Sequence, residues 1–582
     1  MGLQVAVKRC ANALIASWNG LQVSHRGKYS VERMLALEEY VRSTSITRAL
    51  LVFIGTPLPS LAVALLTDCI PLGDPSAGWQ ANPGAWWRAA ILTVVLAIMF
   101  GYEAREQIPG CPLTKRQLVT LTVWVTVLYM PIAIGIAAVW AFPIPFMLLV
   151  VSVPYSVICF VCIGCLIGAR GLQRIEEQTP GAIKRHLDLL QAQNVLIVVY
   201  PAFQALFNAA RARNYDLPVL LLMPWLKISL KHMIARRAGH LEDLMPVLVV
   251  GTVEAFNAFY LATCIQRISS ASTASIVFAV DVAQNVLVLR RIRSNTARVW
   301  SRHQRLYGSR WRGSLLDAIH SLAVTPRKLT TQSLDNIRVR SCVKHSLSGK
   351  ATEILSQLEQ GQPCLIAPYR SRGTRHIVPM LGDKPIGITG IGPNASAVSG
   401  RVGNAPSSGD VVPKHELAVG PADRTMTRPR STRVGDLLAE SHRVLFTIEY
   451  VLLAEYFELF SPFLYVGYMA GMSRLPSARY HDELTDLGDA DLRRTLNSNV
   501  LFALLKVASF ALLLATLRRV SRHDGLLHLA FVLETHMARI QWRMFACLLV
   551  ILGFRIAHYG EHARAAELWP FRLIKALTVL CL

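Results

Sequence analysis

Carboxylates and amides recur at helical spacing within two of the apolar stretches of this sequence. Glu254 is followed three residues later by Asn257 inside the stretch Met245–Ile265, and residues three apart share one face of a helix. The next apolar stretch, about 275–289, carries a second polar stripe at the spacing i, i+3, i+4, formed by Asp281, Gln284 and Asn285. The short connection between the two stretches predicts antiparallel neighbouring helices whose polar stripes face each other.

Two hypotheses explain these stripes. An ionised side chain at the centre of a bilayer costs about 2.5–3.5 kcal/mol on insertion scales, so it persists only where something compensates for it. The stripes either line a polar path for a cation, a proton or a small solute, or form interhelical hydrogen bonds that are purely structural. A cavity between the Glu254 and Asp281 helices favours the path, whereas tight, dry packing favours the structural role.

A second intramembrane acidic cluster is predicted in the apolar and aromatic stretch Val444–Tyr468. It comprises Glu449, Glu455 and Glu458, of which the last two share a helical face and the first does not point cleanly with them. No lysine or arginine interrupts Leu445–Met472. Any cation that pairs with these carboxylates must therefore come from another segment or from solution.

Other motifs give less support for chemistry. Cys159, Cys162 and Cys165 lie inside an apolar span, where small, soft side chains favour helix packing over a metal site. Asp489-Ala490-Asp491 has the spacing of a metal–nucleotide site in glycosyltransferases, but exposed acidic loops are common. The sequence contains no phosphate-binding loop, nucleophile elbow, H-E-x-x-H or G-x-G-x-x-G pattern. We therefore predict no enzymatic activity, no metal and no cofactor.

The composition places these residues in a membrane. Of 582 residues, 52% are apolar and 17% charged, and the mean hydropathy is +0.37; soluble proteins carry about 25% charged residues. The net charge of +24 is concentrated beside apolar runs, as the positive-inside rule requires. This distribution indicates contact with anionic lipid headgroups rather than with nucleic acid.

Apolar runs of about 17–25 residues predict an all-α, multi-pass integral membrane protein with about eight to eleven spans. The clearest runs are Ile46–Ile70, Trp86–Tyr102, Leu118–Trp140 and Pro145–Ile167. Asn194–Ala209 and Leu217–Leu230 are shorter and predict either two short spans or a re-entrant hairpin. Further spans are predicted at Met245–Ile265, Ser275–Leu289, Val444–Tyr468, Val500–Leu517 and Met544–His558.

Through the first four spans, loops that contain lysine and arginine alternate with loops that contain neither. This alternation predicts a cytoplasmic N-terminus. Four parts follow: a cytoplasmic segment 1–45, a first helix bundle 46–289 of about six to eight spans, a basic cytoplasmic insertion 290–441, and C-terminal helices 442–582 with about three spans. The membrane is either the plasma membrane or an endomembrane.

The insertion opens with a cluster of eight arginines that we predict to contact anionic headgroups on the inner leaflet. They are Arg290, Arg291, Arg293, Arg298, Arg302, Arg305, Arg310 and Arg312. Leu347–Leu358 is predicted to form a short amphipathic helix. Lys384–Arg433 is rich in Gly, Pro and Ser and is predicted to be a flexible or disordered linker.

Several stretches carry a family resemblance. They are VEAFNAFY at Val253–Tyr260, DVAQNVLVLR at Asp281–Arg290, EYVLLAEYFE at Glu449–Glu458, YSVER at Tyr29–Arg33 and TPLP at Thr56–Pro59. With these motifs the chain resembles a large group of paralogous multi-pass membrane proteins found in oomycetes. The resemblance covers most of the chain outside the linker. It implies a shared fold and membrane location and implies no activity.

Two functions remain open at this point. The first is movement of a small ion or solute along the polar path. The alternative is a non-transporting membrane scaffold or receptor that acts through its basic cytoplasmic insertion. The expected partners are the lipid bilayer, anionic headgroups and further subunits in a homo- or hetero-oligomer.

Overall fold

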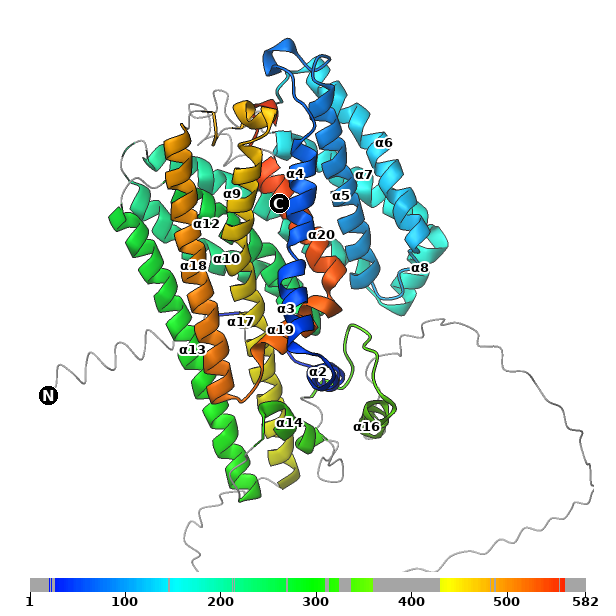
Figure 1. Ribbon diagram of the computed structural model, residues 1–582. Coiled ribbons are helices and arrows are strands. Elements are labelled where there is room, and N and C mark those ends of the chain that lie inside the picture. Colours follow the sequence, from blue (N-terminus) through cyan, green and yellow to red (C-terminus); the bar gives the residue numbers. More distant parts are fainter. Residues whose placement is uncertain are drawn as a thin grey trace, which may run out of the picture. The chain divides into compact units, whose positions relative to one another are not determined.

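The computed structural model describes residues 20, 22–23 and 27–559, apart from positions 145–146, 212, 214, 268–270, 309–312, 324–336, 360–429, 482, 486–487 and 554. Within these residues the regular structure is helical, and an isolated bridge joins His481 to Ile556. The long helices (Figure 1) are α5 (Pro83–Gln107), α6 (Lys115–Val139), α7 (Met147–Ile167), α9 (Ala182–Arg211), α10 (Asp216–Arg237), α13 (Ala271–Tyr307), α17 (Arg430–Met472) and α18 (Asp489–Val520).

Shorter helices complete the described chain. They are α2 (Val31–Ser43), α3 (Ile46–Gly55), α4 (Leu58–Asp68), α8 (Ala169–Gln178), α11 (Met245–Val249), α12 (Ala255–Arg267), α14 (Leu315–Ala323), α16 (Gly349–Glu359), α19 (Gly525–Thr535) and α20 (Met537–Leu548). Two π-helical turns, Val250–Glu254 and Leu549–Gly553, continue α11 and α20. Single 3-10 turns lie at Pro75–Ala77, Glu242–Leu244, Pro476–Tyr480 and Ala557–Tyr559.

Eight helical segments of the described chain are long and apolar enough to cross a membrane. They are Ile46–Asp68, Pro83–Gln107, Lys115–Val139, Val150–Ile167, Ala182–Arg211, Leu217–Arg237, Glu242–Ile265 and Leu492–Val520. Their outer faces expose large apolar side chains such as Leu51, Leu66 and Val127, which water would disfavour and lipid accepts. The chain is a multi-pass helical integral membrane protein.

The central pair of helices bears on one alternative from the sequence. α9 has 30 residues and α10 has 22, so both are long enough to cross a membrane, which favours two spans over a re-entrant hairpin. The predicted stretches were too short because charged residues interrupt the apolar pattern. Lys231, for example, follows directly after the predicted stretch Leu217–Leu230, lies inside α10 and is paired with the buried Glu254.

The 43-residue helix α17 runs through the middle of the helical unit (Figure 1) and packs against α18, α13, α12 and α4. It contains the predicted span Val444–Tyr468 and begins fourteen residues earlier, at Arg430. Because of its three glutamates, α17 is not one of the eight segments that are apolar enough to cross a membrane. Most of its side chains are nevertheless buried among neighbouring helices.

Part of the predicted insertion is folded onto the helices. α14 and α16 both pack against α2, and α14 also packs against α17. The Val31 and Glu32 amides at the start of α2 donate to the carbonyls of Arg338 and Val339 at 2.9 and 3.0 Å. α16 confirms the predicted short helix, whereas residues 384–429 of the predicted linker lie outside the described residues.

The N-terminal segment is tied to α17 by a fully buried ion pair. The Arg33 guanidinium on α2 donates from Nε and Nη2 to the two carboxylate oxygens of Glu449, at 3.1 and 2.8 Å. Arg33 Nη1 contacts His536 Nε2 at 3.1 Å, and His528 Nε2 lies 3.4 Å from Glu449. Because a bidentate pair fixes both groups in one plane, this contact sets the position of α2 on the bundle.

We expect Glu449→Gln to destabilise the protein strongly, because it leaves the fully buried Arg33 cation without its counter-ion. Breaking a buried pair from one side costs about 3–5 kcal/mol. The melting temperature of the detergent-purified protein would report this loss. Glu353→Gln on the exposed side of α16 is the matched control and should leave it unchanged; equal melting of the two variants would contradict the structural role of the pair.

We also expect stability to fall in acid because several histidines are buried or half-buried in the network around Arg33 and Glu449. Burial, helped by the positive charge of Arg33, lowers the pKa of His345 to about 4. Burial lowers the pKa values of His523 and His536 well below the ordinary value. The unfolded chain, with histidine pKa values of about 6.5, therefore takes up protons first, and stability is lost as the pH falls below that value.

The measurement is the melting temperature at successive pH values between about 7 and 5, around the unfolded histidine pKa. His345→Asn should show a shallower decline than the wild type. A melting temperature that is flat or rises on acidification would contradict the prediction.

Candidate functional site

Charged side chains from four helices and a π-helical turn meet in the interior of the helical unit. Lys227 Nζ on α10 lies 2.7 Å from Glu254 and 2.5 Å from Glu458 on α17. Lys506 Nζ on α18 lies 2.6 Å from the other oxygen of Glu458 and 2.7 Å from Asp281 on α13. Glu458 therefore bridges two lysines, and the chain of contacts links α10, α17, α18 and α13.

Two further residues complete what we call the charge cluster: Lys227, Lys231, Glu254, Asp281, Glu455, Glu458 and Lys506. Lys231 forms an ion pair with Glu254. Glu455 accepts a long hydrogen bond from the Ser509 hydroxyl at 3.4 Å, and no ion pair joins it to a described residue.

The charges of the cluster do not balance when every group is ionised. Three ammonium groups face four carboxyl groups, so one negative charge is left over. An uncompensated charge in a low-dielectric interior is costly, and such a group binds a proton or a counter-ion instead. The fourth carboxyl is therefore a position at which a proton or a cation can be held.

A cavity of about 50 Å³ lies against this cluster. Its polar lining comes from Lys227, Asn257, Asp281, Gln284, Glu458 and Lys506, and Leu220, Pro224 and Phe502 are among its apolar walls. One water needs a space of about 10–15 Å³, so the cavity has room for a few water-sized species. Asn257 is buried, and its Oδ1 has no hydrogen-bond partner within the described part of the chain.

Two helix irregularities lie close to the charge cluster and its cavity. The turn Val250–Glu254 is π-helical, and such turns occur often at functional sites. Pro224 lies inside α10 and has no N–H, so the Leu220 carbonyl loses its usual helical donor. Leu220 and Pro224 both line the cavity, so this interruption of the helical hydrogen bonds lies in its wall.

The structure brings most of the predicted path residues together. Asn257, Asp281 and Gln284 line the cavity, and Glu254 lies behind it, held by Lys227 and Lys231. Asn285 instead donates to Ser509 Oγ at 3.0 Å. α12 and α13 each pack against α17 and α18, so the two stripes share a cavity and a set of bridging charges.

The predicted acidic cluster divides into two places. Glu455 and Glu458 belong to the charge cluster, whereas Glu449 pairs with Arg33. The cations that pair with Glu449 and Glu458 come from other helices. This was expected, because Leu445–Met472 contains no lysine or arginine. The lysines themselves were missed, although Lys227 and Lys506 each interrupt a predicted span, which is the signal that could have identified them.

The predicted arginine cluster continues α13 instead of forming a separate segment. Arg290, Arg293, Arg298, Arg302 and Arg305 are exposed on this helix, and Arg302 pairs with Glu440 at 2.8 Å. Arg291 lies on the same helix and is half-buried. Arg310 and Arg312 lie outside the described residues.

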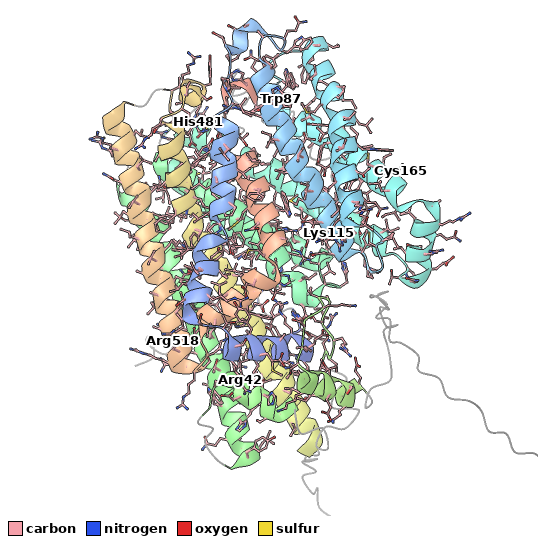
Figure 2. All side chains as sticks on the ribbon, turned by 45° about the vertical axis from the view of Figure 1, so that its right-hand side comes forward. Arg42, Trp87, Lys115, Cys165, His481 and Arg518 are labelled. Carbon is pink, nitrogen blue, oxygen red and sulfur yellow. The ribbon has the colours of Figure 1, made fainter. Side chains whose placement is uncertain are left out.

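The remaining sequence motifs do not join the site. Cys159 and Cys162 on α7 are buried in the apolar core, and Cys165 is exposed on the outer side (Figure 2). No group of three or more potential metal ligands occurs in the described residues. The side chains of Asp489 and Asp491 lie outside the described part of the chain.

Comparison with known proteins yields no relative: no protein-family model, curated protein or solved structure matches the chain. The functional argument therefore depends on the geometry of the site.

We expect Lys506→Met to destabilise the protein, because it leaves Asp281 and Glu458 without their shared cation. The loss should be about 3 kcal/mol, as for other buried pairs broken from one side. Adding Asp281→Asn should recover part of it, since the two residues interact directly. Melting temperatures in detergent would measure both effects.

Lys115→Met, at the exposed start of α6 (Figure 2), is the matched control and should change stability by less than about 0.5 kcal/mol. If the effects of the Lys506 and Asp281 substitutions on stability were strictly additive, this would contradict a direct interaction between the two residues.

Proposed function

We propose that the protein moves a small ion or solute across the membrane, and that the charge cluster and its cavity are the binding site. The observation that supports this proposal is a cavity with room for a few water-sized species that lies against the charge cluster, in which carboxyls outnumber ammonium groups by one. That size and surplus favour a proton or a small monovalent cation. Intramembrane ionisable residues of this kind commonly mark ion pathways and proton relays.

The lysines suggest how binding is coupled to movement. Lys506 holds α13 and α17 together through Asp281 and Glu458. A proton or cation that binds either carboxylate competes with Lys506 and weakens this link between helices. Such competition converts occupancy of the site into a change in helix packing, as bistable packed elements allow.

The orientation belongs to the same proposal, with the N-terminus in the cytoplasm. Arg42 and Arg518 lie near one end of the helical unit, and Trp87 and His481 lie near the other (Figure 2). The basic end would face the cytoplasm by the positive-inside rule. Membership of the oomycete-type group is a further proposal, supported by the motifs alone.

The second candidate function is a membrane scaffold that acts through its basic segment. The five exposed arginines on α13 favour it, because each basic residue near an anionic leaflet contributes about 1 kcal/mol of attraction. This function does not require the cavity, so loss of the cavity residues would leave it intact.

Flux measurements in proteoliposomes test the transport proposal. A pH-sensitive dye would report proton movement, and Na⁺ and K⁺ gradients would be imposed in turn. Glu455→Gln removes the surplus carboxyl without breaking an ion pair, so we expect flux to fall at least about tenfold while the melting temperature is kept or rises. Asp281→Asn should also abolish flux, with some loss of stability.

Asp317→Asn on the partly exposed helix α14 is the matched control and should transport like the wild type. Absence of flux in the wild type under every gradient, or full flux in Glu455→Gln, would contradict the proposal.

A further inference from the structure

A second and larger cavity, of about 110 Å³, lies on the other side of the π-helical turn. Residues of α5, α6, α7, α9, α20 and the two π-helical turns line it, and most of them are apolar. Polar groups gather at one place, where Glu103, Gln193 and Arg543 meet. None of these residues belongs to the charge cluster.

Arg543 at the polar end, and Arg539 one turn away on the same helix, each have buried donors without an acceptor in the described residues. Arg543 forms an ion pair with Glu103 and donates from Nη1 to the Leu248 carbonyl at 3.1 Å. With its amide oxygen toward Arg543 Nη2 and its nitrogen toward Glu103, Gln193 bridges the pair at 2.9 and 3.1 Å. Arg543 Nε is buried and has no acceptor in the described residues, and an unfilled buried donor is costly.

The charge at this end is already balanced. One turn along the same two helices, Arg539 pairs with Glu106, so two arginines face two glutamates. An additional anion would leave a net negative charge in a low-dielectric region. The polar end therefore suits a neutral, oxygen-bearing group rather than a carboxylate or a phosphate.

The shape of the cavity is elongated along α5. Its lining runs from Ala89 to Glu103, which is about 21 Å at 1.5 Å per residue. One half of a bilayer's hydrocarbon core is about 15 Å thick. Glu103 lies one turn from the end of α5 at Gln107, so the polar end is near a membrane surface and the apolar part extends into the core.

The cavity also reaches the outer surface of the helices. Leu148 and Ser152 on α7 and Ile197 on α9 line it and are only half-buried. These residues form the side that faces lipid between the two helices. An apolar chain can therefore enter laterally from the bilayer.

From these observations we infer that the cavity binds an acyl chain of a membrane glycerolipid, with the ester group at the polar end beside Gln193 and Arg543. A glycerolipid supplies the three required features: a long apolar chain, a neutral oxygen acceptor at its start, and access from the membrane. The inference does not depend on ion movement at the charge cluster.

Photocrosslinking tests this site directly. The purified full-length protein is reconstituted with a phosphatidylcholine that carries a diazirine in one acyl chain, illuminated, digested and mapped by mass spectrometry. We expect adducts on the inward-facing lining of α5, between Leu92 and Phe100. Ser156→Phe, which fills the cavity from α7, should reduce them about tenfold, the effect of a 1.4 kcal/mol loss of affinity.

Val157→Phe is the matched control, because Val157 is the next residue on α7 and points outward with 54% exposure; its adducts should equal those of the wild type. Ser152→Phe, paired with Val153→Phe, repeats the comparison one turn away should Ser156→Phe fail to fold.

Excess unlabelled phosphatidylcholine should compete for the site, and free fatty acid should not. Two outcomes would contradict binding in this cavity. One is that adducts form on outward-facing residues alone; the other is that Ser156→Phe and Ser152→Phe both leave the adducts unchanged. Competition by the free acid alone would overturn the assignment of an ester carbonyl.

Discussion

A charge inside a membrane protein must have a partner, and that constraint determines much of how these helices pack. Lipid tails are as apolar as the helices, so hydrophobic burial alone gives little reason for one helix to choose another. Ion pairs determine which helices pack together here, because each pair joins segments that are far apart in the sequence. Arg33 meets Glu449, Glu103 meets Arg543, and Arg555 meets Glu483.

The helix α17 illustrates this most clearly. Near its middle it carries Glu449 for Arg33, about nine residues further on Glu458 for two lysines, and toward its C-terminal end Tyr468, whose hydroxyl donates to Asp68 at 2.6 Å. Its central place follows from these partners on four different helices.

The sequence was sufficient for properties that depend on local pattern. Apolar runs predicted the membrane class, and the spacing of Glu254 and Asn257 predicted a shared face. Properties that depend on distant partners could not be predicted in this way. Nothing near Glu458 indicates that Lys227 and Lys506 will reach it, because those lysines lie 231 and 48 residues away in the chain. The full lengths of α9 and α10 could not be predicted for the same reason. Charged residues within a span are expected only where their partners are known.

The π-helical turn at Val250–Glu254 separates the two cavities. Gly251 and Thr252 line the larger one, and Asn257 lines the smaller. A π-turn accommodates one residue more than the α-helix around it, and each α-helical residue turns the chain by about 100°. Loss of one residue here would leave the composition and hydropathy of the segment almost unchanged, yet it would rotate one lining set away from its cavity. In evolutionary terms the length of this segment is constrained as well as the identity of Glu254.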